Sequence, residues 1–123
     1  MLSGQDILAA CNGKPLEPIT QAAWGGQVCL LRMTADQSDG MYVYWREHGN
    51  PEDGSGWRAF VVAWCLCGED NVPLFRDDEL LAAWRKFRGS AVATVDRLFE
   101  VAAKANGILP EDSEEALGQA VKN

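Results

Sequence analysis

Phe60-Val-Val-Ala-Trp-Cys-Leu-Cys67, followed directly by Gly68-Glu-Asp-Asn-Val-Pro-Leu-Phe75, is the stretch that decides the fold. The first part is apolar on nearly every side, so it must be buried on most of its faces. Periodicity alone fits either a central helix or a buried strand. The length of the run over 57–67 and its alanines favour a helix, whereas its valines and aromatic residues favour a strand. We expect a central core helix.

Before this core run, the chain predicts a β-hairpin. Two β-leaning runs, 19–24 and 27–33, flank Gly25-Gly26, which is typical of a hairpin turn. Ahead of the hairpin, residues 5–11 are expected to form a short helix that Ser3 caps.

Three amphipathic helices and a short final helix complete the expected fold. Thr34 and Gln37 form a capping box, so a helix should begin at Ala35 and end before Gly49. Further helices are expected from Asp77 or Asp78 to 88, from 91 to 106 with Ser90 as its cap, and over 110–121. The expected apolar stripes of the three longer helices are Met41, Tyr44, Trp45 and His48; Leu80, Leu81, Trp84 and Phe87; and Ala91, Val92, Val95, Leu98, Phe99 and Ala102.

These patterns predict a mainly α fold, a small helical domain of about five helices with one N-terminal β-hairpin. A chain of 123 residues is long enough for one core, so we expect a single domain over 1–123. Within it, the hairpin occupies about 19–33 and the helical body about 35–121. The Gly-rich segment 49–56 reads as a flexible loop.

The charge pattern argues against nucleic acid and membranes as partners. The net charge is −7, and the densest basic run, 85–88, falls at a helix end where cations favour the helix dipole. Binding to nucleic acid requires clustered Lys and Arg to replace phosphate counterions. No apolar run approaches the length of a membrane span, and no secretory signal opens the chain. We therefore expect a cytoplasmic protein.

The sequence offers no catalytic or metal-binding constellation, and we expect a non-enzymatic protein without cofactors. The four cysteines lie in apolar surroundings, and the spacing Cys65-Leu-Cys67 lacks the two-residue spacer of zinc knuckles. His48 is the single histidine and is expected to pack or cap a helix end. Counted from Asp70, the third and fifth positions of a calcium loop would be Val72 and Leu74, so the pattern fails; turns and helix caps explain the acids of this region.

Four residues are candidates for binding another protein: Trp24, Trp57, Tyr42 and Arg32. Trp24 lies beside the Gly-Gly turn and Trp57 beside the Gly-rich loop, so both are harder to bury than Trp64 and Trp84. Exposed aromatic residues commonly anchor protein–protein contacts. For Trp24 and Trp57, an interface role and plain packing are weighted equally.

The order of elements over 28–123 resembles the tail assembly chaperones of long-tailed, non-contractile, lambda-like bacteriophages. The resemblance has two departures: Asn71-Val72 replaces the usual glycine step of the turn, and Arg76 stands where a hydroxyl cap is common, which moves the expected cap to Asp77. The matching pieces are Val28-Cys-Leu-Leu-Arg-Met-Thr34, Ala59-Phe-Val-Val-Ala-Trp-Cys-Leu66, Glu69-Asp-Asn-Val-Pro-Leu-Phe75, Val95-Asp-Arg-Leu-Phe-Glu-Val-Ala102, Asn106-Gly107 and the acidic tail that ends in Lys122-Asn123.

The resemblance implies a non-enzymatic assembly factor in the host cell cytoplasm that is not in the mature virion. Such proteins bind the long tape-measure protein and help recruit the major tail-tube protein around it. They usually have a second version extended by a programmed −1 frameshift, and codons for Lys122-Asn123 can form a slippery site. Self-association is expected as well, because repeated contacts raise avidity on an extended partner. The alternative is a small acidic adaptor or regulator that binds one folded partner.

Overall fold

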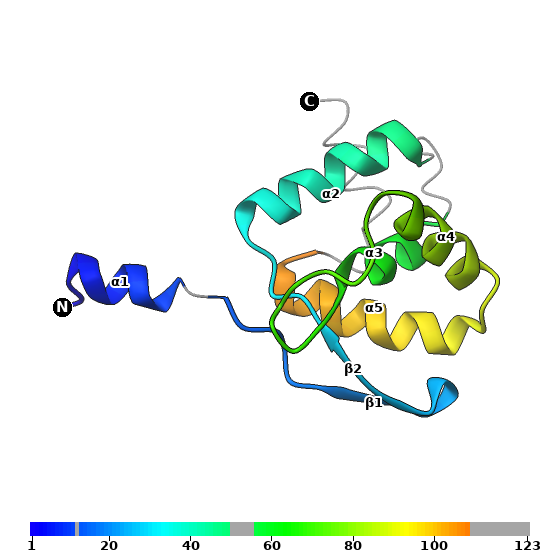
Figure 1. Cartoon of the computed structure of the whole chain (residues 1–123), viewed down its shortest axis with the longest axis horizontal. Helices are drawn as coiled ribbons and strands as arrows, with labels where there is room; N and C mark the ends of the chain where they lie inside the picture. Colours follow the sequence, from blue (N-terminus) through cyan, green and yellow to red (C-terminus); the bar gives the residue numbers. More distant parts are fainter. Residues whose placement is uncertain (12, 50–55, 109–123) are drawn as a thin grey trace.

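The computed structural model of the chain describes residues 1–11, 13–49 and 56–108, and these residues form a mainly α fold with a small antiparallel sheet (Figure 1). The expected fold class is confirmed. Its elements are α1 (Gly4–Ala10), β1 (Ile19–Gln21), the 3₁₀ turn η1 (Ala22–Trp24), β2 (Gly26–Leu30), α2 (Ala35–His48), α3 (Trp57–Cys65), β3 (Leu66–Cys67), α4 (Asp77–Arg88) and α5 (Val92–Asn106).

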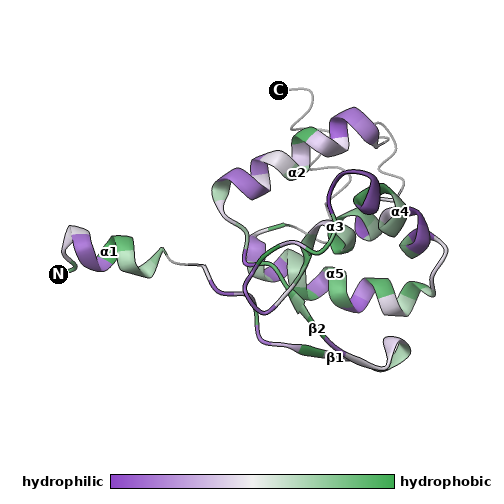
Figure 2. Ribbon diagram, in the orientation of Figure 1, coloured by the Kyte–Doolittle hydropathy of each residue, from purple (hydrophilic) through white to green (hydrophobic). Residues whose placement is uncertain are grey.

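Helix α3 is the centre of the fold, as expected from its apolar sequence. It packs against both α4 and α5, with α2 on a further side. Eight of its nine residues are buried, and only Arg58 is exposed. Figure 2 shows the contrast between hydrophobic α3 and the more hydrophilic start of α4. A helix covered by three others needs an apolar surface on almost every side.

Most of the run 57–67 forms the expected helix, and its last two residues form a strand. The helix ends at Cys65, and Leu66 turns to extended backbone with φ −64° and ψ 129°. The two residues of β3 then pair antiparallel with β2, with Cys29 opposite Cys67 and Leu30 opposite Leu66. The core run therefore supplies both the central helix and the third strand of the sheet.

The predicted hairpin is confirmed, with shorter strands than its sequence runs. β1 pairs antiparallel with β2, and Ile19 lies opposite Val28. Between the strands, η1 leads into Gly25, whose φ of 75° is left-handed. Glycine adopts this conformation without the steric cost that a side chain would bring. The strand order is β1-β2-β3, so β1 lies at an edge of the described sheet.

Two asparagines hold the segment that connects β2 to α2. Asn106 Oδ1 accepts a hydrogen bond from Met33 N (2.7 Å), and its Nδ2 donates to Leu31 O (2.9 Å). Asn71 accepts from Arg32 N (3.3 Å) and donates to Arg32 O (3.4 Å). Asn71 has a φ of 63°, which asparagine tolerates better than most residues. Asn71 therefore adopts the left-handed backbone of its turn and also tethers that turn to the connection between β2 and α2.

The predicted caps, Asp77 for α4 and Ser90 for α5, are wrong, and Asp77 is instead the first residue of α4. Arg76 is the N-cap residue of α4 and makes no side-chain cap bond; its guanidinium donates instead to Trp64 O (3.1 Å) and lies 3.9 Å from the centre of the Trp64 ring. Burial lowers the pKa of Arg76 from its ordinary value. Ala91 is the N-cap residue of α5, because Ser90 Oγ donates backwards to Lys86 O (3.1 Å). The side chains of Arg76 and Ser90 therefore bond to residues earlier in the chain rather than to the first turn of the helix that follows.

An aromatic cluster joins α2, α3 and α4. The ring of Trp45 lies 5.2 Å from Trp57, 5.5 Å from Phe60 and 5.6 Å from Trp84, measured between ring centres. Of the predicted stripes, Met41, Trp45, Leu80 and Trp84 are buried, as are Val95, Leu98, Phe99 and Ala102. The remaining members are partly buried (Tyr44, Leu81 and Phe87) or exposed (His48, Ala91 and Val92), which corrects the expectation for the last three.

Helix α1 stands away from the rest of the fold (Figure 1). Ser3 and Asp6 form a capping box, which confirms Ser3 as the cap, and these hydrogen bonds lower the pKa of Asp6. No residue of α1 is buried, and Leu2, Ile7 and Leu8 are at least half exposed. The expected helix over 110–121 and most of the expected loop over 49–56 lie outside the described residues.

Candidate partner-binding surface

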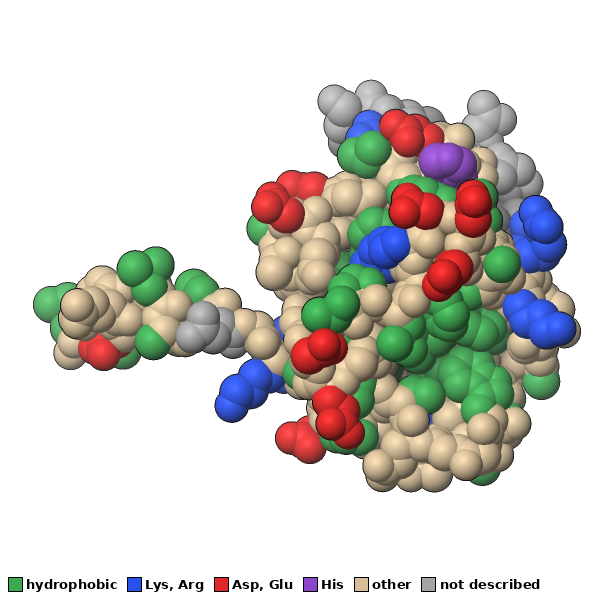
Figure 3. All heavy atoms as spheres, in the orientation of Figure 1, with side chains coloured by type: hydrophobic (Ala, Val, Ile, Leu, Met, Phe, Trp, Pro, Cys, Tyr) green, Lys and Arg blue, Asp and Glu red, His purple; other side chains and the backbone are tan. Residues whose placement is uncertain are grey.

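Trp24 lies at the hairpin tip and remains accessible, with 38% of its surface exposed. Its ring stacks on Phe87 of α4 with 5.3 Å between ring centres and 19° between planes. Phe87 also meets the edge of Phe75 at 6.4 Å. We call Trp24, Phe75 and Phe87 the Trp24 patch. Figure 3 shows hydrophobic side chains gathered between α4 and the hairpin tip.

From its sequence, Trp57 is expected to be harder to bury than Trp64 and Trp84, but only 2% of its surface is exposed. The interpretation of Trp57 as a residue that is hard to bury is wrong. It begins α3 and enters the aromatic cluster, where Tyr42 stacks on it at 5.7 Å. Tyr42 is half-buried, and burial raises the pKa of its phenol. This pair therefore fills the space between α2 and α3, and Trp57 offers almost no surface to a partner.

Arg32 is exposed, and its backbone is fixed at both its N–H and its carbonyl by Asn71. These two bonds order the backbone of Arg32, and its side chain lies at the surface. The structure does not bring the four candidates together into one site. Trp57 and Tyr42 stack on each other, whereas Trp24 contacts α4. Binding of a partner by any of the four stays a prediction.

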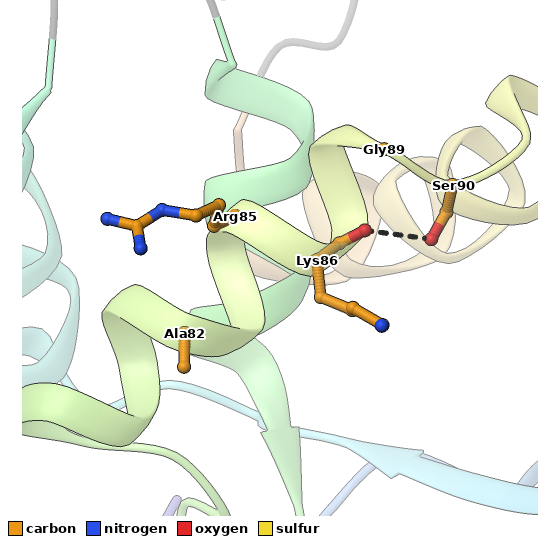
Figure 4. A pocket seen from close by; sticks show the side chains of 5 residues that line it. All are labelled: Ala82, Arg85, Lys86, Gly89 and Ser90. Atoms are coloured by element: carbon orange, nitrogen blue, oxygen red, sulfur yellow. Dashed lines mark hydrogen bonds between the residues drawn. The ribbon is translucent and has the colours of Figure 1, made fainter.

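A further surface lies on the outer face of α4, where the sequence indicated only a basic helix end. A shallow hollow of about 440 Å³ is lined by Ala82, Arg85, Lys86, Gly89 and Ser90 (Figure 4). The side chain of Arg85 extends to the left in this view, whereas that of Lys86 extends downward and to the right. Ala82 and Gly89 have little or no side chain, so the surface is recessed at these two positions. The spacing i, i+3, i+4, i+7, i+8 of these five residues is the signal that could have found this face.

Two of the buried cysteines, Cys65 and Cys67, are held as neutral thiols. Burial raises the pKa of Cys65 to about 12 and that of Cys67 to about 11. The thiolate is the reactive form, so these thiols are poor nucleophiles near neutral pH. His48 is exposed, stacks on Tyr44 at 4.1 Å and donates from Nδ1 to Tyr44 O (3.2 Å). It packs against its own helix, as expected.

The residues that the structure describes contain no group of three or more His, Cys, Asp or Glu side chains that could hold a metal ion. None of their helices combines the length and the apolar character that a membrane crossing requires. The chain matches no family model, and it has no match among the curated proteins or the solved structures.

Proposed function

We propose that this protein is a bacteriophage tail assembly chaperone that binds the tape-measure protein and helps recruit tail-tube subunits without catalysing a reaction. The observation that carries the proposal is the ordered set of matching segments over 28–123. These include the core run 59–66, the acidic turn 69–75 and the helix segment 95–102. The proposed place of action is the host cytoplasm, and the protein leaves before the virion matures.

The exposed apolar surface supports this proposal physically. A chaperone for a long helical partner needs apolar contacts that remain open while its own core stays closed. The Trp24 patch meets this requirement, because Trp24 is 38% exposed and rests on Phe87 of the packed helix α4. Leu2, just before α1, and Leu8 of α1 offer further apolar contact, with 69% and 73% of their surfaces exposed.

Co-expression with the tape-measure protein tests the proposal. We expect the wild-type chain to raise the soluble fraction of the tape-measure protein and the Trp24→Ala variant to lose most of this effect. Val92→Ser is the matched control, because Val92 is 72% exposed on the start of α5 and lies outside the Trp24 patch. A chain that leaves tape-measure solubility unchanged while forming a 1:1 complex with one folded protein would contradict the proposal and favour an adaptor.

The gene itself provides an independent test. We expect a −1 reading frame that overlaps the end of this frame, followed by a long open reading frame with a helical pattern. The codons for Val121, Lys122 and Asn123 are expected to read GTA AAA AAC. The codon AAG at Lys122 would remove this slip site and contradict the frameshift part of the proposal.

A further inference from the structure

The charges of α4 are separated along the helix. Its first turn carries Asp77, Asp78 and Glu79, and its last turn carries Arg85, Lys86 and Arg88. No acid of this helix has a cation three or four residues further on, so the usual ion pairs within a helix are absent from its sequence. The one ion pair between described residues joins Arg58 to Asp96, away from α4.

Four of these charges lie on the outer face of α4 in a regular arrangement. Asp78 and Arg85 are seven residues apart, which places them on one side of Ala82; Glu79 and Lys86 have the same spacing and lie on the other side. All five residues are exposed. Seven residues span about 10 Å along a helix, too far for an ion pair within one copy.

The arrangement is complementary to itself about Ala82. We propose that α4 packs antiparallel against α4 of a second copy of this chain, with the two-fold axis at Ala82. Asp78 then meets Arg85 of the second copy, and Glu79 meets Lys86 of the second copy. The symmetry repeats both pairs, so the contact contains four ion pairs. A closed two-fold dimer is the commonest form of self-association.

The shape of this face suits a second helix. Ala82 is exposed at the point where the helices cross, and a small side chain there lets two helices approach closely. The hollow beside it, bounded by Arg85, Lys86, Gly89 and Ser90, has room for the carboxylates of the second copy. The opposite face of α4 is occupied, because Leu80, Ala83 and Trp84 are buried in the body of the molecule.

The second copy is the occupant that the charges favour. An acidic helix alone would match Arg85 and Lys86 but would meet Asp78 and Glu79 with like charge. A basic helix would have the reverse problem. An antiparallel copy of α4 places cations opposite the acidic first turn and acids opposite the basic last turn. A parallel copy would place like charges opposite each other, which disfavours that arrangement. The inference does not depend on the tape-measure protein.

Charge reversal with full-length chains tests the dimer by analytical ultracentrifugation. Arg85→Glu with Lys86→Glu makes the face wholly acidic, and Asp78→Lys with Glu79→Lys makes it wholly basic. We expect each variant alone to dimerise roughly tenfold or more weakly than the wild type. An equimolar mixture of the two is expected to form the heterodimer. Higher ionic strength should weaken the wild-type dimer.

The control has the same change in charge on another surface. Arg97→Glu with Lys104→Glu alters two exposed residues of α5 and is expected to leave dimerisation unchanged. A wild-type chain that stays monomeric at low ionic strength would overturn the proposal. So would variants that dimerise like the wild type, or a mixture that fails to associate. A monomer whose charge reversals weaken only tape-measure binding would assign this face to that partner instead.

Discussion

Trp24 and Trp57 both adjoin glycines in the sequence, yet the structure treats them differently. Trp24 at the hairpin tip is 38% exposed and stacks on a single ring. Trp57 at the start of α3 is 2% exposed and lies among three rings of α2 and α3, those of Tyr42, Trp45 and Phe60. Neighbouring glycines therefore do not indicate exposure. The decisive property is whether the adjoining element is covered on all its sides, as α3 is and the hairpin tip is not.

Truncation of Trp57 should have the largest effect on stability. The Trp57→Ala variant removes a buried indole from between α2 and α3, which typically costs about 3–5 kcal/mol of the free energy of unfolding. Chemical denaturation followed by circular dichroism measures this loss. A loss below about 1 kcal/mol would mean that Trp57 is not a core residue and would remove the contrast with Trp24.

The thiols extend the comparison between covered and uncovered parts of the chain. Cys11 is exposed, whereas Cys29, Cys65 and Cys67 are buried. A thiol reagent near neutral pH is therefore expected to label one cysteine in the native chain and four after unfolding. Mass spectrometry of the labelled chain identifies the site. Rapid native labelling of Cys65 would contradict the closed core.

The raised pKa of Cys65 leads us to expect that the stability of the fold depends on pH. Burial raises the pKa of Cys65 from 9.0 to about 12, so the stabilisation from its neutral thiol is complete below about pH 9. This contribution is lost as the pH rises toward 12, because the unfolded thiol ionises first. Denaturation at increasing pH should show a shallower decline for Cys65→Ala than for the wild type. Equal slopes would show that the thiol does not contribute.

Truncation of Trp24 should have the smallest effect on stability. The Trp24→Ala variant loses one stacking contact with Phe87, worth about 0.5–1.5 kcal/mol. Denaturation under the conditions used for Trp57→Ala provides the comparison. If both tryptophans cost the same, the hairpin tip belongs to the core and the Trp24 patch is not a free surface.

Local sequence signals predicted most helices and the hairpin. The capping boxes of Ser3 and Thr34 and the stop at Gly107 placed helix ends within a residue or two. The cap predicted at Asp77 failed because α4 already includes that residue and follows Arg76, which bonds to Trp64 O; the cap predicted at Ser90 failed because Ser90 bonds back to Lys86 O. These are tertiary or backward contacts, which a pattern read in one direction along the sequence does not contain.

The candidate surface was only partly predictable for the same reason. Trp24 could be identified from the Gly-Gly turn, but its support on Phe87 joins residues far apart in the chain. The roles of Asn71 and Asn106 were hidden, because both bind the backbone of 31–33 across the fold. The seven-residue spacing of the charges on α4 can be read from the sequence. Which face of α4 is exposed depends on where α3 packs against it, and the sequence does not show this.

Hydrogen exchange of the chain with and without its tape-measure protein tests the central claim most directly. We expect the amides around Trp24 and the last turns of α4 to gain protection in the complex. The amides of α3 around Phe60 should exchange slowly in both states, because this helix is already buried. Unchanged exchange at the hairpin tip in a saturated complex, or new protection confined to other segments, would contradict the Trp24 patch as the binding surface.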